Sequence, residues 1–258
     1  MITNALDRLS FEMVSDLEGP DLEERNSYIE RPSAVSEHSF LFEAWPLLKQ
    51  VEVQSPPTWL TPGNQLRVVT WNMERCKYVE ESAELIKSLN PDVCLVSEID
   101  IGMARSYQRH TIKDLALELD YGYVYGVEFI ETSLGDDRER VWHAGESNSR
   151  GLHGGAILSP HKLERPALLR LEQSGYWWQH RFKGEVRIGG RIAVLASLTV
   201  GGKAVTFVSV HFESHTDPAH RAEMMENMID SIDAYDKDTP VIIGGDLNTC
   251  TTGFDLSR

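Results

Sequence analysis

Apolar residues recur from Leu66 onward with the two periods that distinguish strands from helices. Short runs rich in β-branched residues and bounded by turn formers predict strands at 66–71, 92–100, 123–130, 154–159, 163–173, 185–198, 203–212 and 241–245. Apolar residues three and four apart predict helices at 75–89, 110–120 and 216–235. The chain therefore alternates helices and strands over most of its length.

The pair Gly201-Gly202 lies between the apolar runs SLTV and KAVTFVSVHF and predicts a tight hairpin. A hairpin joins antiparallel strands, so the pattern excludes an all-parallel sheet. Helices after the first and second strands indicate layers that cover the sheets. We therefore expect a mixed α/β sandwich, not a doubly wound nucleotide-binding fold.

Residues 1–65 have a different character, with eleven acidic and four basic residues and repeated prolines. Leu6, Leu9, Phe11, Met13 and Leu17 suggest one short amphipathic helix. The apolar residues within 41–48 are too many for a free tail. We expect an acidic extension over 1–65, docked on a domain of residues 66–258, with the proline-rich stretch 55–63 as the boundary.

The formal net charge of −15 disfavours a nonspecific binder of duplex DNA, because an acidic surface repels the phosphate backbone. Cys76, Cys94 and Cys250 have no CxxC spacing and cannot all pair, which indicates reduced thiols. The N-terminus lacks the apolar run of a secretory signal, and no run is long enough to span a bilayer. We expect a cytoplasmic protein.

Polar side chains follow four of the predicted strands at the point where each strand ends. They are Asn72, Glu98, His211, and the pair Asp246 and Asn248 after VIIGG. Each has an ordinary alternative as a turn former, a helix cap or a solvated strand end. Strand ends that meet at one edge of a sheet are where sites are usually built, and together these side chains predict one.

The chemistry that suits this set is phosphoester hydrolysis. Mg²⁺ prefers oxygen ligands, commonly one or two carboxylates with several waters, and Glu98 can supply one. Asp246 can orient or deprotonate a water, and His211 can donate to a phosphate oxygen or protonate the leaving group. The amides of Asn72 and Asn248 can hold oxygens by hydrogen bonds.

These segments resemble the endonuclease/exonuclease/phosphatase superfamily. The motifs TWNM (70–73), HGGAILS (153–159), SVHFES (209–214) and GGDLNT (244–249), with the strand that carries Glu98, occur in the family order. The resemblance covers roughly residues 66–250. It implies a four-layer α/β/β/α sandwich and cleavage of phosphoesters with Mg²⁺ or Mn²⁺.

The resemblance also implies roles for single residues. Asn72 and Glu98 would belong to the metal site, His211 would contact the phosphate, and Asp246 with Asn248 would position the nucleophile. The family normally ends with an Asp-His motif, which does not follow Asn248 before Arg258. We therefore expect a sequence truncated at its C-terminus, with weak activity or none. The alternative is a catalytically silent relative that binds a ligand or partner.

Three further features have competing interpretations. Arg150 and His153 flank Gly151 and can bind a substrate phosphate, or belong to a solvated loop. A zinc site at His211, His215 and His220 is disfavoured, because the spacing fits no zinc motif. The aromatic run from Tyr176 to Trp178 can stack on a base or rest on lipid, but core packing is the better interpretation.

Overall fold

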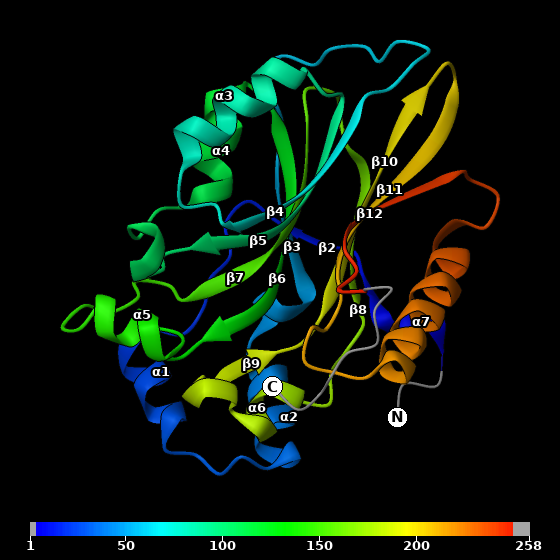
Figure 1. The fold of residues 1–258 in the computed structure, drawn as a ribbon. Coiled ribbons are helices and arrows are strands. Elements are labelled where there is room, and N and C mark those ends of the chain that lie inside the picture. The colour runs from blue at the N-terminus through cyan, green and yellow to red at the C-terminus, as the bar shows by residue number, and fades with distance from the viewer. Residues whose placement is uncertain (1–3, 250–258) are drawn as a thin grey trace.

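The predicted strands build two mixed sheets that lie face to face, with helices on both outer sides (Figure 1). The computed structural model describes residues 4–249. In this range the structure confirms the expected α/β/β/α layers. The predicted hairpin at Gly201-Gly202 is also confirmed, since both glycines have positive φ and the strands on either side pair antiparallel.

The larger sheet has seven strands among the described residues. Its order is β2 (Glu12–Val14), β3 (Gln50–Gln54), β6 (Gly122–Glu131), β7 (Leu152–Ser159), β5 (Val93–Ile101) and β4 (Val68–Arg75), and β9 (Arg187–Gly189) pairs with β6. The β2–β3 and β4–β5 pairs are parallel, and the other pairs are antiparallel.

The smaller sheet has five strands in the described range. Its order is β1 (Leu9–Ser10), β8 (Glu164–Arg170), β10 (Ile192–Val200), β11 (Lys203–His211) and β12 (Val241–Asp246). Only the β11–β12 pair is parallel, and its register places His211 opposite Asp246. Parallel neighbours end at the same sheet edge, so this pairing brings two predicted site residues together.

Helices cover the two outer faces (Figure 1). They are α1 (Leu22–Ile29), α2 (Val35–Ala44), α3 (Val79–Leu89), α4 (Thr111–Leu119), α5 (Asp137–Trp142), α6 (Tyr176–His180) and α7 (Pro218–Asp236), with 3-10 turns η1 (Ala5–Arg8), η2 (Pro46–Lys49), η3 (Ala104–Ser106) and η4 (Phe182–Gly184). The helices α3 and α4 lie on the larger sheet, and α7 lies on the smaller one.

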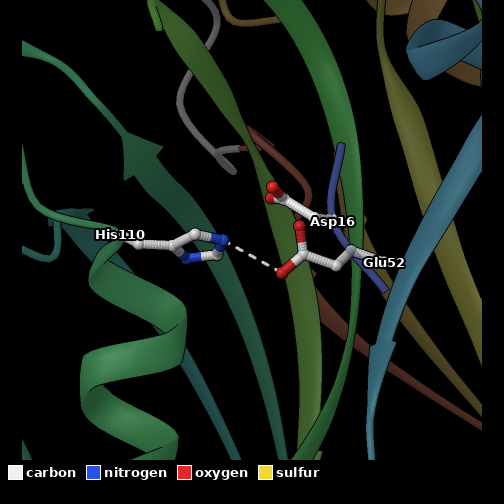
Figure 2. Close-up of side chains that lie close together, drawn as sticks. All are labelled: Asp16, Glu52 and His110. Atoms are coloured by element: carbon white, nitrogen blue, oxygen red, sulfur yellow. Dashed lines mark ion pairs between the residues drawn. The ribbon is translucent and has the colours of Figure 1, made fainter. Parts of the chain in front are cut away.

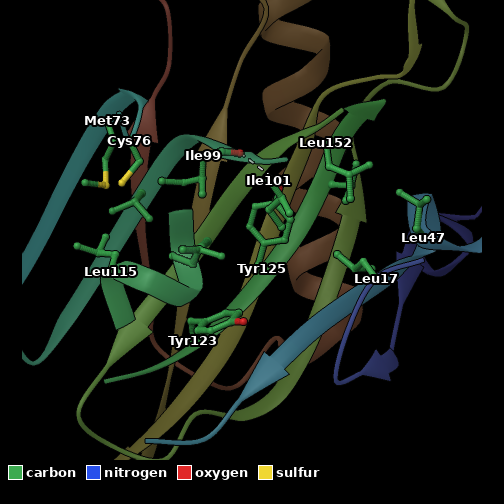
Figure 3. Packing of buried hydrophobic residues seen from close by; sticks show 14 of the residues in the cluster. Leu17, Leu47, Met73, Cys76, Ile99, Ile101, Leu115, Tyr123, Tyr125 and Leu152 are labelled. Carbon is green, nitrogen blue, oxygen red and sulfur yellow. Dashed lines mark hydrogen bonds between the residues drawn. The ribbon is translucent and has the colours of Figure 1, made fainter. Parts of the chain in front are cut away.

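Three apolar layers hold the sandwich together. One packs the outer face of the larger sheet against helices, and Figure 3 shows Tyr125, Ile101 and Leu152 within it. A second lies between the smaller sheet and α7, where Met224 and Met228 are buried. The third fills the space between the sheets. Burial of apolar area on this scale is the main stabilising contribution to such a fold.

The prediction of a short amphipathic helix near the N-terminus is wrong, because this segment forms strands. Residues 9–10 pair with β8, and residues 12–14 pair with β3, so this segment adds strands to both sheets. The pairing satisfies backbone groups at two sheet edges, and this tertiary gain outweighs a weak helical pattern. The boundary between an extension and a domain stays a prediction.

The loop predicted over 131–153 contains the short helix α5, which begins with a reciprocal capping box between Asp136 and Glu139.

The cysteines in the described range are reduced, as expected. Cys76 and Cys94 are free and buried, and burial raises the pKa of each thiol to about 12. Cys250 lies outside the described residues. Across residues 4–249 the helices are all too short or too polar to cross a membrane.

Candidate active site

The ends of β5, β11 and β12 surround a pocket of about 240 Å³. Five of the predicted site residues line it, namely Glu98, His153, His211, Asp246 and Asn248. Asn72, near the end of β4, contacts two of them through its amide. The structure therefore brings together residues that lie up to 176 positions apart in the sequence.

The amide of Asn72 links the two carboxylates at the base of the pocket. Its Nδ2 lies 3.0 Å from Glu98 Oε1 and 3.0 Å from Asp246 Oδ2, and it donates to both. Carboxylates that share one donor are held close together without a charge between them. This places acidic oxygens from both sheets at one point of the pocket.

Glu98 reaches the pocket through an irregular backbone. Its φ is +56°, which is uncommon for a residue other than glycine, and the β5–β7 register shifts between Val96 and Ile99. The β4–β5 register shifts as well, between Asn72 and Arg75. Bulges of this kind re-aim side chains at sheet edges. The two register shifts therefore allow the side chains of Asn72 and Glu98 to turn toward each other.

The glycines before Asp246 are required by close packing. A Cβ on Gly244 would lie 2.8 Å from a Leu95 methyl of the other sheet, and one on Gly245 would lie 1.8 Å from the Val210 carbonyl oxygen. Gly245 also has φ +145°, which other residues rarely adopt. The glycine pair lets β12 approach both neighbours, and this approach sets the position of Asp246.

Arg75 supplies a positive charge to one of the two carboxylates. It forms an ion pair with Glu98 Oε2. Burial of Glu98 opposes its ionisation, but Arg75, His153, His211 and the Asn72 amide outweigh it and lower the pKa of Glu98 below its usual value. Glu98 is therefore an anion at neutral pH.

Asn248 holds the far side of Asp246. Its backbone N–H donates to Asp246 Oδ1 at 2.9 Å, and its side-chain Nδ2 donates to the Phe212 carbonyl at 2.8 Å. The residue has φ +49°, a conformation that Asn tolerates better than most residues. Asn72 and Asn248 thus fix the two oxygens of Asp246 from opposite sides.

His211 is oriented by charged residues behind it. Arg191 Nη1 lies 2.9 Å from His211 Nδ1, and Glu128 Oε2 lies 3.6 Å from the same nitrogen. Arginine can only donate, so in this contact Nδ1 of the ring is the acceptor and the ring hydrogen lies on Nε2. That Nε2 is 4.0 Å from Glu98 Oε1, so its N–H faces the pocket.

A buried ion network supports this wall of the pocket. Glu128 is paired with Arg191 at 2.9 Å, and Arg191 also contacts Glu213 at 3.1 Å. Desolvation opposes the charge on Glu128, yet Arg191, His211 and His153 lower its pKa strongly. Such a pair costs solvation to bury, so its value lies in fixing geometry more than in stability.

His153 belongs to a second part of the network. Its Nδ1 donates to Asp100 Oδ1 at 2.6 Å, and Asp100 is held by Arg105. Burial lowers the pKa of His153 although Asp100 opposes the shift, so the ring is neutral at neutral pH. Its Nε2 lies 3.9 Å from Glu128. His153 therefore lines the pocket as part of the buried framework.

Arg150 lies elsewhere. It is not among the residues that line the pocket, and its Nη1 lies 3.0 Å from Asp16 Oδ1. The cations at the outer part of the pocket are Arg138, Lys183 and Arg187. Arg138 lies in α5 and Lys183 in η4, and neither element was predicted, so no sequence pattern brought these cations together.

Arg75, Glu128 and Glu213 also line the pocket, although no sequence pattern predicted them as site residues. Glu128 is a charged residue in the apolar run 123–130, and this break in the pattern was the one signal that could have revealed it. Trp177 is buried and lines the pocket, while Trp178 is fully buried in the core. Both stand on α6, and its helical geometry places adjacent side chains on different faces.

The donor set at the pocket base fits a hard divalent cation. Glu98 and Asp246 offer carboxylate oxygens, which suit Mg²⁺ with waters in its other positions. The Asn72 amide faces both carboxylates with Nδ2, and its Oδ1 accepts from the Glu74 N–H at 3.1 Å. Within residues 4–249 one other group can hold a metal, formed by Asp16, Glu52 and His110, and none of the three lines the pocket. The chain therefore carries two separate candidate metal positions.

Comparison with solved structures shows the same fold. A protein from Beutenbergia cavernae described as endonuclease/exonuclease/phosphatase is 19% identical with a TM-score of 0.54, and the match covers 74% of this chain and 49% of that one. The human nocturnin catalytic domain, solved with a bound sulfate anion, is 16% identical with a TM-score of 0.51, covering 77% and 72%. A Bacteroides vulgatus protein of the same description matches at 16% and 0.51, covering 73% and 67%.

The chain thus spans about half the length of the Beutenbergia protein. A search of curated proteins finds no match. Residues 69–258 match the model of a family described as "Endonuclease/Exonuclease/phosphatase family", which is well over half of the chain. The matched range contains Asn72, Glu98, His211 and Asp246. The chain belongs to the endonuclease/exonuclease/phosphatase family.

Proposed function

We propose that this chain is a divalent-metal-dependent phosphoester hydrolase. One observation carries the proposal: the Asn72 amide holds Glu98 and Asp246 together at 3.0 Å each, in a pocket that His211 also faces. Family membership supports phosphoester hydrolysis in general. The metal requirement and the roles below are inferred from the residues.

Glu98 would hold the cation with Asp246 beside it, and Asn72 would join them through Oδ1, which also accepts from the Glu74 N–H. Mg²⁺ is our first choice and Mn²⁺ the second, because the donors are all oxygen. When bound, the ion would polarise a phosphoryl oxygen and offset its negative charge. Arg75 keeps Glu98 ionised, so this carboxylate is available as a ligand at neutral pH.

Asp246 is placed to orient a water and accept its proton. Asn248 donates to Oδ1 and Asn72 donates to Oδ2, so the carboxylate cannot rotate freely. A base that is held in one orientation loses little entropy when it engages a water. The two amides therefore act as positioning groups for Asp246.

His211 is placed to donate through Nε2 to a phosphate oxygen or to the leaving group. Arg191 and Glu128 fix its Nδ1, so the ring presents one N–H to the pocket. A donor that is preorganised toward developing negative charge stabilises the transition state more than the ground state. This is the general-acid or phosphate-binding role in the proposal.

The substrate is a small phosphoester, a nucleotide or a lipid headgroup. Arg138, Lys183 and Arg187 line the pocket in a chain of net charge −15, and two of them are paired there, Arg138 with Asp136 and Arg187 with Glu185. Cations in a pocket attract a compact anion, whereas an acidic surface repels a long nucleic acid. His153 stays in the proposal as a residue of the pocket wall, and Arg150 does not touch the pocket.

Hydrolysis of bis(p-nitrophenyl) phosphate with Mg²⁺ tests the function. We expect weak Mg²⁺-dependent turnover by the unchanged chain, because the family's final Asp-His motif does not follow Asn248, and a further loss of roughly 100-fold or more in kcat in Asp246→Asn. Asp230→Asn, on the outer part of α7, is the matched control and should retain the full rate. If substrate analogues bind in the pocket without turnover, the chain is a silent binding module instead and the proposal fails.

A further inference from the structure

Three side chains outside the pocket converge on one point. Asp16 follows β2, Glu52 lies in β3, and His110 immediately precedes α4. Their ligand atoms all lie within 4.8 Å of one another. Figure 2 shows the His110 ring pointing at the Glu52 carboxylate, with the Asp16 carboxylate beside it. We call these residues the outer cluster.

Glu52 is a buried carboxylate with specific partners. Its side chain is 1% exposed, Tyr123 donates its hydroxyl to Oε1 at 2.5 Å, and the Leu17 N–H donates to Oε2 at 3.2 Å. A buried carboxylate needs a compensating positive charge. Within the described residues the imidazole of His110 is one source of that charge and a bound cation is the other, because Arg150 is paired with Asp16.

His110 alone does not satisfy the Glu52 carboxylate by a hydrogen bond. His110 Nε2 is 2.9 Å from Glu52 Oε1, but the pair lacks hydrogen-bond geometry. Both ring nitrogens are shielded from solvent, and neither makes a hydrogen bond with a described residue. Buried polar atoms are nearly always satisfied, and an unsatisfied nitrogen aimed at two carboxylates points to a missing partner.

We propose that Asp16, Glu52 and His110 bind a divalent transition-metal ion of the Zn²⁺ type. One imidazole nitrogen with two carboxylates favours Zn²⁺ over Mg²⁺ or Ca²⁺, which prefer oxygen alone. Two ligands at the corners of a tetrahedron about 2.1 Å from one ion lie about 3.4 Å apart. The ligand atoms lie within 4.8 Å of one another, so the widest pair must close by up to about 1.4 Å. Water completes the coordination on the side of Asp16, whose side chain is 66% exposed.

The ion would tie the N-terminal segment to the main body. Asp16 and Glu52 come from the part of the chain before the family match at residue 69, and His110 comes from within it. His110 is also bridged through its backbone to Ile101. A cation held by all three would stabilise the docking of β2 and β3 on this side of the larger sheet.

Zn²⁺ titration in excess Mg²⁺ tests the site, because Mg²⁺ occupies oxygen-donor positions and leaves the imidazole site open. We expect one equivalent of Zn²⁺ to bind and to raise the thermal midpoint. His110→Gln and Asp16→Asn should each weaken binding by more than about 10-fold. His143→Gln is the matched control, since His143 also pairs with one carboxylate, Glu146, and its side chain is 21% exposed against 17% for His110.

Co²⁺ binding gives a second measurement, which would not change if His110 only supported the fold. Co²⁺ bound by the cluster should show a visible absorption that His110→Gln removes and His143→Gln retains. Asp16 is exposed, so Asp16→Asn should fold even if His110→Gln does not. The proposal is overturned if the unchanged chain binds no Zn²⁺ under these conditions, or if Asp16→Asn and His143→Gln bind it equally well.

Discussion

The pocket and the outer cluster each contain two carboxylates, but a different group contacts the carboxylates in each site. In the pocket, an amide separates Glu98 from Asp246, and Arg75 neutralises part of the charge. In the outer cluster, an imidazole faces Glu52. Donor chemistry decides which ion a site prefers. The pocket suits a hard cation with waters, and the cluster suits Zn²⁺.

The two sites also differ in how they relate to the family. Every residue proposed to act in the pocket lies within the matched range 69–258, whereas Asp16 and Glu52 lie before it. The pocket residues therefore come from the part of the chain that matches the family. The outer cluster depends on a segment that the family match does not include.

The largest expected effect in this comparison concerns His211. We predict that His211→Gln lowers kcat about 100-fold, because a preorganised donor to the phosphate is lost. Glu128→Gln should lower it as well, and the double variant should be little worse than His211→Gln, since the two side chains are 3.6 Å apart and act as a unit. Steady-state kinetics of the three variants measure this.

His215→Gln is the control for that series. His215 also lines the pocket but is exposed and stacks on Phe182, so we expect a much smaller change in kcat. Fully additive losses in His211→Gln and Glu128→Gln would contradict the assignment of Glu128 as the residue that orients His211. None of these variants should change Zn²⁺ binding at the outer cluster.

An intermediate effect is expected on KM, because pH changes the charge of Glu185. Burial raises the pKa of Glu185 to about 7, and Glu131 and Glu139 add to the shift while Arg187 opposes it. Glu185 is therefore neutral below pH 7 and becomes an anion above it. Since it lines the pocket, its charge repels an anionic substrate, and KM should rise about 5-fold as pH rises through 7.

Glu185→Gln isolates this contribution. The variant stays neutral at every pH, so its KM should be as low at pH 8 as that of the unchanged chain at pH 6. The same linkage affects folding: an acid with a raised pKa in the folded state destabilises it progressively as pH rises from its usual value to about 7. A KM profile that is identical in both proteins would remove Glu185 from the account.

The smallest expected effect is that of Arg150→Gln, which should leave the pocket unchanged and alter only the outer cluster. Arg150 pairs with Asp16 and does not line the pocket, so Arg150→Gln should change kcat/KM by less than about 2-fold. Removal of its positive charge beside Asp16 should tighten Zn²⁺ binding by up to about 5-fold. A large rise in KM with unchanged Zn²⁺ affinity would restore Arg150 to substrate binding, as the sequence alone had suggested.

The sequence predicted the fold well where local pattern and tertiary contacts agree. Alternating apolar runs gave β10 and β11, and the glycine pair between them gave their hairpin. Polar residues after the predicted strands singled out Asn72, Glu98 and Asp246, whose side chains the structure brings into contact, while their roles stay predictions. The family resemblance then supplied their order and the expected layers.

The rest depended on contacts that no local pattern encodes. The strands at 9–14 exist because β3 and β8 offer free edges, which the sequence does not show. Glu128 and Arg191 meet across 63 residues, and only the folded chain makes them partners. The outer cluster joins three segments that share no motif. Long-range ion pairs of this kind require the structure.

The Mg²⁺ dependence of phosphodiester hydrolysis, measured on Glu98→Gln and His110→Gln side by side, tests the central claim most directly. The account predicts that the unchanged chain and His110→Gln have the same Mg²⁺ activation curve, and that Glu98→Gln has lost at least about 100-fold in kcat at every Mg²⁺ concentration. Turnover that persists in a chelator, or a Glu98→Gln variant as active as the unchanged chain, would contradict it.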